Sequence, residues 1–200
     1  MAPHPDPSSL AARKAEVRRT ALAARDALDP EARRAASDAI ARTLLALPAL
    51  LGAKLVAGYW PIRSEVDPRP AMTALAERGA RLALPHVTPG GLVFREWYPG
   101  AALVRGGFGL SEPDPSLPEV APDALLVPLA AFDRAGRRLG YGRGYYDGAI
   151  ARLSEGRALL TVGLCFAAQE VPSVPVEPHD RSLSAIVTEA GSLSLEDPHG

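Results

Sequence analysis

Residues 137–147 read Arg-Arg-Leu-Gly-Tyr-Gly-Arg-Gly-Tyr-Tyr-Asp, and they connect a short apolar run at residues 124–127 with a helix predicted over residues 144–153. Short apolar strands that alternate with helices are typical of a parallel or mostly parallel sheet that is covered on both faces. In such sheets ligands bind beyond the carboxyl ends of the strands, which is where this stretch lies.

The same alternation of helices and strands continues on both sides of this stretch. Three further helices are predicted from capping residues, first-turn prolines, and the proline or glycine that ends each of them. Their ranges are 9–28 (capped by Ser8 or Ser9), 30–47 and 67–79. Further strands are predicted at residues 54–60, 81–84 (closed by Pro85), 92–97, 157–166 and 182–187.

The connections and the chain ends complete the predicted fold. Residues 105–123 are expected to form a long surface connection, and residues 132–143 a polar loop. We predict an α/β fold, a three-layer α/β/α sandwich with a mostly parallel sheet, in a single domain over residues 8–190. Residues 1–7 and 191–200 are expected to be flexible tails.

The composition excludes several classes of protein. The 200 residues carry a formal net charge of -1 without a basic cluster, so no nucleic-acid partner is expected. No apolar stretch approaches the roughly 20 residues of a membrane span, and the N-terminal residues lack the apolar core of a signal peptide. The single cysteine, Cys165, excludes an intrachain disulfide and lies in the apolar run 159–166. We therefore expect a cytoplasmic protein.

The glycines of the opening stretch favour phosphate binding. Without Cβ atoms, alternating glycines let backbone N–H groups turn toward an anion, and the helix that follows adds free N–H groups. Arg137, Arg138 and Arg143 can add charge-assisted bonds. The stretch is not a P-loop, which ends in Gly-Lys-Ser/Thr, nor a dinucleotide fingerprint, whose third glycine would fall at Tyr145. The alternative is a flexible loop with a solvated arginine face.

Two aspartates are candidates for magnesium. Asp147 lies in the first turn of the predicted helix, where a carboxylate either complements the helix dipole or holds an ion that bridges nucleotide phosphates. Asp180 follows Glu177-Pro178-His179, and its alternative role is that of a turn residue or a helix cap. From the residues alone both roles stay open for Asp147, whereas for Asp180 the role of turn residue or helix cap is favoured.

Several fragments together resemble the 5-formyltetrahydrofolate cyclo-ligases, also called methenyltetrahydrofolate synthetases. The most specific is Arg-Leu-Gly-x-Gly-x-Gly-Tyr-Tyr-Asp at residues 138–147, preceded by Val127-Pro128 and Phe132-Asp133. Weaker fragments occur in the family order: Lys14-x-x-x-Arg18, Tyr59 to Glu65, Phe108-Gly109-Leu110-x-Glu112-Pro113 and Pro175-x-x-Pro178-His179-Asp180. The resemblance spans roughly residues 14–189. One departure is Leu129-Ala130, where a glycine often follows the Val-Pro pair.

The resemblance implies an enzyme that converts 5-formyltetrahydrofolate and ATP, with magnesium, into 5,10-methenyltetrahydrofolate, ADP and phosphate. Use of ATP is chemically reasonable, because a formamide carbonyl is a poor electrophile and ring closure must expel its oxygen. Phosphorylation of that oxygen gives an iminium-like carbon and a good leaving group. The protein must then position the substrates and stabilise the charge on the transferring phosphoryl group.

The resemblance also implies the nucleotide-binding residues. Lys14 and Arg18 lie four residues apart on a helix and share one side, which by itself indicates only a solvated helix face. The resemblance makes both of them nucleotide-phosphate ligands, and it makes Arg138 and Tyr145 catalytic residues. Tyr145 is preferred over Tyr146 as the ligand-facing ring, because Tyr146 shares a helix face with Ile150. The cradle for the ATP phosphates is expected to consist of Arg138, Leu139, Gly140, Tyr141, Gly142, Arg143, Gly144, Tyr145 and Tyr146.

The implied magnesium and folate ligands complete the site. Asp147 and Asp180 are expected to hold magnesium, directly or through water. Glu65 is expected to accept hydrogen bonds from the N–H groups of the pterin, and Trp60 and Trp97 to pack against it. Without the resemblance, Glu65 is an exposed loop acid and each tryptophan a core residue.

Rival functions stay open on the residues alone. Sugar-phosphate isomerases and acyl-CoA transferases also use mostly parallel α/β domains with phosphate loops, but they need neither ATP nor Lys14 and Arg18. A binding protein that has lost turnover is disfavoured by the intact set of charged residues. The expected partners are the folate and ATP, with no nucleic acid and no membrane, in a monomer or weak homodimer.

Overall fold

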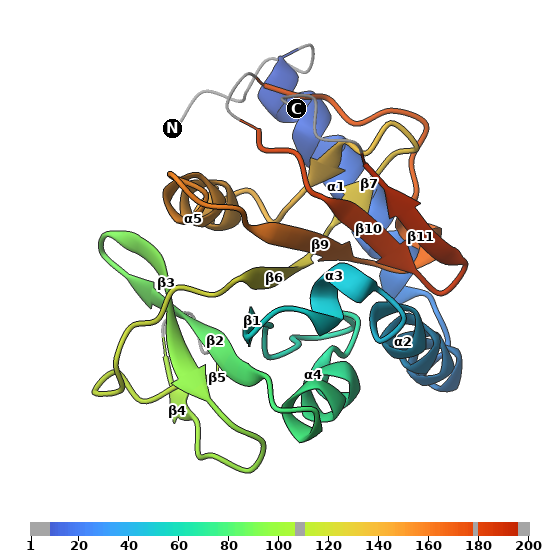
Figure 1. Cartoon of the computed structure of the whole chain (residues 1–200). Coiled ribbons are helices and arrows are strands. Elements are labelled where there is room, and N and C mark those ends of the chain that lie inside the picture. Colours follow the sequence, from blue (N-terminus) through green and yellow to red (C-terminus); the bar gives the residue numbers. More distant parts are fainter. Residues whose placement is uncertain (1–8, 107–110, 178–179, 196–200) are drawn as a thin grey trace.

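The computed structural model describes residues 9–106, 111–177 and 180–195. Seven strands form the central sheet, and five helices surround it (Figure 1). The strands are β1 (Leu55–Ala57), β2 (Arg81–Thr88), β3 (Gly91–Trp97), β6 (Ala124–Pro128), β9 (Leu160–Leu164), β10 (Ala185–Thr188) and β11 (Gly191–Ser194). The helices are α1 (Leu10–Asp26), α2 (Pro30–Leu44), α3 (Pro48–Leu51), α4 (Arg69–Glu77) and α5 (Tyr145–Leu153).

The sheet is mostly parallel, which confirms the predicted α/β class. Its strand order is β11-β10-β9-β6-β1-β2-β3. The pairs from β10 through β9, β6 and β1 to β2 are parallel, and the two edge strands β11 and β3 are antiparallel to their neighbours. The carboxyl ends of the parallel strands therefore meet at one edge of the sheet.

Alternation along each strand divides the core into two layers. In β1, Val56 packs with α2, α3 and α4 on one face, whereas Leu55 and Ala57 pack with α5 on the other. Figure 1 shows the same division, with α5 on one side of the sheet and α2, α3 and α4 on the other. This arrangement confirms the predicted three-layer sandwich.

Helix α1 lies at the edge where the carboxyl ends of the parallel strands meet, rather than over the middle of the sheet. Ser9 caps it by accepting a hydrogen bond of 3.2 Å from Ala12 N, while Ser8, the alternative cap, lies outside the described residues. The helix contacts β7 (Ala131–Phe132) and the 3-10 turn η2 (Ala167–Gln169), which follow β6 and β9. Among the described helices, none has the combination of length and apolarity that a membrane span requires.

One strand is longer than predicted. β2 was expected to stop before Pro85 but continues to Thr88, with Pro85 facing Phe94 in the antiparallel register with β3. β1 pairs with β2 only as far as Ala83. A proline without an N–H is tolerated where one side of a strand has no neighbour to accept a hydrogen bond, so Pro85 does not end this strand.

Three segments expected to be irregular contain strands. Gly191–Ser194, predicted to belong to a flexible tail, pairs antiparallel with β10 as the edge strand β11, and its Leu193 packs on the α5 side of the core. β7, at the start of the predicted loop 132–143, pairs with β8 (Arg138–Leu139) inside it. Likewise β4 (Val104–Arg105), at the start of the connection 105–123, pairs with β5 (Ser111–Glu112) inside it. Strands of two to four residues carry too little periodicity to be predicted.

The packing around Gly163 of β9 leads to a stability prediction. A Cβ at this position would lie 2.7 Å from Leu129 Cδ1 and from Leu183 Cδ1. We expect Gly163→Ala to destabilise the fold by about 1–3 kcal/mol through overpacking, which corresponds to a fall in Tm of roughly 2–12 °C for a chain of this length. Thermal unfolding followed by circular dichroism measures the change.

Gly148→Ala is the matched control. Gly148 lies inside α5 with nothing within 4 Å of an added Cβ, and alanine is favoured over glycine in helices by up to about 1 kcal/mol. This variant should keep or raise the Tm. A Gly163→Ala protein as stable as the parent would show that the two leucines move aside without loss of packing.

Candidate active site

The glycine loop, residues 140–144, lies between β8 and α5 and has a backbone that favours glycine. Gly142 has a φ of +89°, and Gly144, the N-cap of α5, has a φ of +66°. Both angles are in the left-handed region, where a Cβ is unfavourable. A Cβ on Gly142 would also lie 3.3 Å from the guanidinium carbon of Arg18. Gly142 therefore lets α1 come close to the loop, whereas Gly144 is required by its backbone angle alone.

Helix α1 brings both predicted cations to the loop and to the segment around Asp180. Arg18 Nε donates a hydrogen bond of 2.8 Å to the carbonyl oxygen of Gly140, 122 residues away in the sequence. One turn earlier, Lys14 Nζ binds Glu177 Oε2 at 2.6 Å and Asp180 Oδ2 at 2.7 Å. The spacing of four residues places both side chains on the same side of the helix, as predicted.

The charges around Lys14 bear on what this region can bind. Burial lowers the pKa of Lys14, but its bonds to Asp180 and Glu177 outweigh burial and leave the pKa above its usual value. Lys14 is therefore an ammonium ion at neutral pH. A phosphate attracted to it would lie beside two carboxylates, where a divalent cation can offset the repulsion between the negative groups.

Asp147 lies in the first turn of α5 and is fixed through one of its oxygens. Its Oδ1 accepts hydrogen bonds from Arg138 at 2.7 Å and from the backbone N–H of Arg181 at 3.2 Å. The second bond joins α5 to the segment that carries Asp180, so the two predicted magnesium ligands come from adjoining segments. Arg138 is buried beneath this contact, with only 8% of its surface exposed.

The donor set around Asp147 fits a magnesium ion. Within the described residues both hydrogen bonds of Asp147 are made by Oδ1, which leaves Oδ2 available to a ligand. No group of three or more His, Cys, Asp or Glu side chains forms a cage in the described parts of the chain. Magnesium does not need one, because it usually takes one or two carboxylates together with water and substrate phosphates.

Glu65 ends a tight turn, residues 62–65, in the loop after β1. Its Oε2 accepts a hydrogen bond of 2.9 Å from Ile62 N, and its own N–H donates to Ile62 O at 3.1 Å. Arg63 within this turn has a φ of +53°, the one positive φ of a non-glycine residue in the described chain. Strained backbone of this kind persists where the surroundings hold it and is frequent at functional sites. The turn thus fixes the direction of the Glu65 carboxylate.

Arg25 is a site residue that the sequence analysis missed. It lies near the end of α1, only 2% exposed, and its NH1 donates a hydrogen bond of 2.6 Å to the hydroxyl of Tyr141 in the glycine loop. The Tyr141 hydroxyl also interacts with Glu65 and lowers the pKa of that carboxyl. The spacing of Arg25 from Arg18, seven residues or two helical turns, was the available signal that both lie on the same side of α1.

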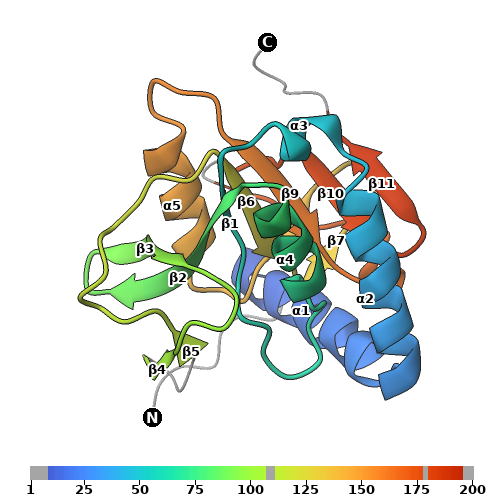
Figure 2. The same ribbon diagram turned by 60° about the horizontal axis from the view of Figure 1, so that its bottom comes forward.

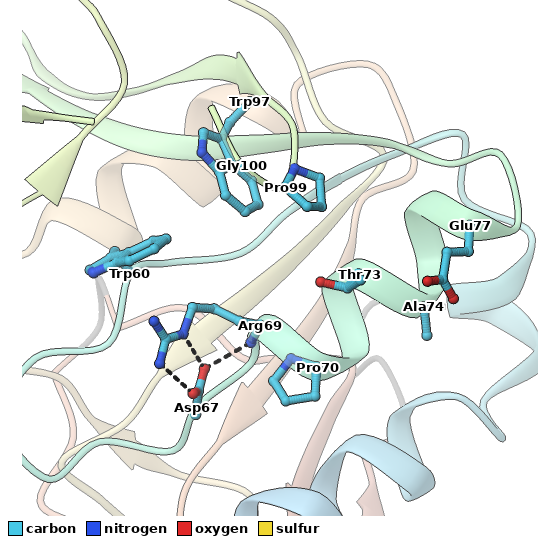
Figure 3. A pocket seen from close by; sticks show the side chains of 10 residues that line it. All are labelled: Trp60, Asp67, Arg69, Pro70, Thr73, Ala74, Glu77, Trp97, Pro99 and Gly100. Atoms are coloured by element: carbon cyan, nitrogen blue, oxygen red, sulfur yellow. Dashed lines mark hydrogen bonds and ion pairs between the residues drawn. The ribbon is translucent and has the colours of Figure 1, made fainter. Parts of the chain in front are cut away.

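The two tryptophans lie in a separate groove. Trp60 and Trp97 meet edge to face with ring centroids 6.0 Å apart, and the Arg69 guanidinium lies 4.8 Å from the Trp60 ring (Figure 3). Asp67 holds Arg69 through bonds of 2.8 and 2.6 Å. The groove has a volume of about 650 Å³, and the described residues that line it include neither Glu65 nor the glycine loop. The predicted folate ligands are thus distributed over two places.

Two residues of the stretch 137–147 that were expected to help bind phosphate, Leu139 and Arg137, have side chains with other partners. The side chain of Leu139 is in the core with Ala21 and Val174, so only its backbone can face a ligand. The guanidinium of Arg137 binds the buried carboxylate of Asp133 at 2.7 Å, where it supports the turn before β8 instead of the loop. Arg143, in contrast, is exposed on the loop.

The two tyrosines at the start of α5 both pack on the α5 side of the core. Burial raises the pKa of Tyr146 strongly, and the charge of Glu65 adds to this rise. The Tyr146 hydroxyl therefore lies close enough to Glu65 to be affected by its charge, which the sequence did not indicate. The catalytic role of Tyr145 stays a prediction, and Phe108-Gly109-Leu110 and Pro178-His179 lie outside the described residues.

Comparison with known proteins gives one consistent result. Residues 10–189 match the 5-formyltetrahydrofolate cyclo-ligase family. The chain is 33% identical to the 5-formyltetrahydrofolate cyclo-ligase of Escherichia coli K12, over 82% of this chain and 93% of the relative. It is 30% identical to the Mycolicibacterium smegmatis protein of the same name, over 88% and 93%.

A solved structure extends the agreement to the fold. The NMR structure of Aquifex aeolicus 5,10-methenyltetrahydrofolate synthetase superimposes with a TM-score of 0.80 at 33% sequence identity. The superposition covers 94% of this chain and 95% of that one. The likeness therefore includes the sheet, the helices on both faces and the edge that carries the candidate site.

Proposed function

Because the chain belongs to the 5-formyltetrahydrofolate cyclo-ligase family, we propose that it converts 5-formyltetrahydrofolate to 5,10-methenyltetrahydrofolate with ATP and magnesium. One observation carries the proposal: close interactions join the three predicted parts of the site. Arg18 donates a hydrogen bond to the glycine loop, Asp147 accepts one from the segment of Asp180, and Tyr141 of the glycine loop interacts with Glu65. A nucleotide on the loop would thus lie next to a substrate held by Glu65.

The glycine loop and α1 form the nucleotide half of the site. Backbone N–H groups at the start of α5 favour an anion, since they have no partner within the helix. Arg18 stays charged although partial burial lowers its pKa, and it lies against Gly140 and Gly142. Arg138 lies at the base of the loop, where its charge can stabilise the phosphoryl group as it transfers.

Asp147 and Asp180 would hold the magnesium ion. The ion, when bound, neutralises charge on the nucleotide phosphates. Arg138 and the Arg181 N–H orient the Asp147 carboxylate through Oδ1, and Lys14 and the Glu177 N–H orient that of Asp180 through Oδ2. The protein thereby places the two carboxylates before either ligand arrives, which reduces the cost of ordering them on binding.

The folate half of the site centres on Glu65. Its carboxylate would accept hydrogen bonds from the pterin and place the formyl oxygen near the terminal phosphate. A bond then forms between that oxygen and phosphorus while the bond to ADP breaks. The neighbouring folate nitrogen attacks the activated carbon and releases its proton to solvent, and the C–O bond breaks to release phosphate. Positioning and charge stabilisation are the tasks of the protein in both steps.

The test is a turnover assay with the purified chain. We expect the absorbance of the methenyl product to rise when 5-formyltetrahydrofolate, ATP and magnesium are all present, and not when any one of them is omitted or the metal is chelated. No signal with any of several nucleoside triphosphates would overturn the enzymatic assignment. Binding of both ligands without turnover would instead indicate a binding protein that keeps the family fold.

A further inference from the structure

The end of α1 touches both the glycine loop and the turn of Glu65. Arg25 NH1 donates to the Tyr141 hydroxyl at 2.6 Å, and Arg25 Nε donates to Asp26 Oδ1 at 3.1 Å. Ser64, the neighbour of Glu65, donates its hydroxyl hydrogen to the same oxygen of Asp26. Figure 2 shows the loop after β1 passing beside α1. One helix end is therefore bonded to the two segments proposed to bind the two substrates.

The direction of the hydrogen bonds around Tyr141 follows from the chemistry of the three groups. A guanidinium only donates, so the Tyr141 oxygen must accept from Arg25. A phenol has one hydrogen to donate, and its other partner is Glu65, whose ionised carboxylate only accepts. The chain of bonds therefore runs from Arg25 through Tyr141 to Glu65. Because the guanidinium charge polarises the hydroxyl, the bond to Glu65 is strengthened.

We propose that Tyr141 and Arg25 are positioning residues that hold Glu65 oriented and ionised for the folate. The inference rests on the proposed function and extends it, because it assigns the side chain of a glycine-loop residue to the folate half of the site. The Tyr141 backbone lies between Gly140 and Gly142, next to Arg18. Its hydroxyl accepts a hydrogen bond from Arg25 and interacts with Glu65. Loss of this hydroxyl should therefore affect the folate and spare the nucleotide.

The groups that face Glu65 explain why it needs this support. Burial raises the pKa of Glu65, whereas the hydrogen bond from Tyr141, the Ile62 N–H and the charges of Arg25 and Arg63 lower it. Two further hydroxyls lie near, those of Tyr59 and Tyr146, and burial together with the Glu65 charge raises the pKa of each. They stay neutral at physiological pH. Removal of the Tyr141 hydroxyl takes away a donor, so the pKa of Glu65 should rise further.

The experiment compares Tyr141→Phe with the parent in steady-state kinetics over a range of pH. We expect the KM for 5-formyltetrahydrofolate to rise about tenfold, as for loss of one hydrogen bond to a charged group, with the KM for ATP within about twofold of the parent. The fall in folate affinity at acidic pH should begin at a higher pH in the variant. If Tyr141 had a purely structural role, the ratio of the KM for 5-formyltetrahydrofolate to the KM for ATP would not change, and neither would the pH profile.

Two control variants show whether the effect belongs to the bond between Tyr141 and Glu65. Tyr98→Phe removes a hydroxyl from a tyrosine that is 68% exposed and should leave both KM values unchanged. Arg25→Lys, which keeps a donor for Tyr141, should retain more folate affinity than Arg25→Met at equal Tm.

The opposite outcomes are distinct. An unchanged folate KM and pH profile in Tyr141→Phe, or a rise in the KM for ATP alone, would overturn the inference while turnover still supports the proposed function. A parent protein that binds both substrates without turnover would contradict the proposed function. The inference about Tyr141 and Arg25 would still be testable, because the folate affinity of Tyr141→Phe can be measured directly by calorimetry.

Discussion

Asp147→Asn is expected to lower kcat by at least about a hundredfold, the scale on which one electrostatic ligand of a transition state acts. The amide keeps the shape of the side chain, and its oxygen can still accept from Arg138 and the Arg181 N–H. What it loses is the negative charge with which Oδ2 would hold magnesium. Turnover should therefore fall at ordinary magnesium concentrations, and the concentration needed for half-maximal rate should rise.

Stability should respond much less than turnover. Arg138 loses an ionic partner but keeps a hydrogen bond, so we expect the Tm to fall by about 10 °C or less. The matched control is Glu155→Gln, which neutralises an exposed carboxylate just beyond the other end of α5 and should leave both quantities unchanged. If Asp147→Asn unfolds as readily as it loses activity, or works at normal magnesium concentrations, then Asp147 is a structural partner of Arg138.

The sequence allowed the nucleotide half of the site to be predicted better than the rest. The spacing of Lys14 and Arg18 put both on one side of a helix, and the family resemblance made both of them nucleotide ligands; the structure brings Arg18 to Gly140 and Lys14 to Asp180. Glycines at 142 and 144 marked the positions with positive φ. These are local patterns, in which residue type and spacing determine geometry. The ligand roles themselves stay predictions.

Long-range contacts could not be predicted in the same way. Arg25 has no motif around it, and its partner Tyr141 is 116 residues away. Trp60 and Trp97 meet in their groove because of the way the loop after β1 folds back. The periodicity of the sequence does not predict the path of that loop. Pro85 was expected to end a strand, but the early end of β1 leaves room for it. In each case a neighbour remote in sequence decides the outcome.

Glu65→Gln should raise the KM for 5-formyltetrahydrofolate by about ten- to a hundredfold, because a hydrogen bond to a charged group contributes about 1.5–3 kcal/mol. The amide cannot accept two N–H groups as a carboxylate does, and its own N–H₂ would oppose the donors of a pterin. The KM for ATP should stay within about threefold, since the substituted atoms are not part of the glycine loop. Initial rates with each substrate varied in turn measure both values.

Glu77→Gln distinguishes the two places where a folate can lie. Glu77 is exposed on α4 and lines the groove with Trp60 and Trp97, opposite the rings in Figure 3. If the pterin binds at Glu65, this variant should match the parent while Glu65→Gln loses folate affinity. If Glu77→Gln loses affinity and Glu65→Gln does not, the pterin lies in the tryptophan groove. Since Glu65 interacts with Tyr141 of the glycine loop and the groove lining has no contact of that kind among the described residues, we expect the first result.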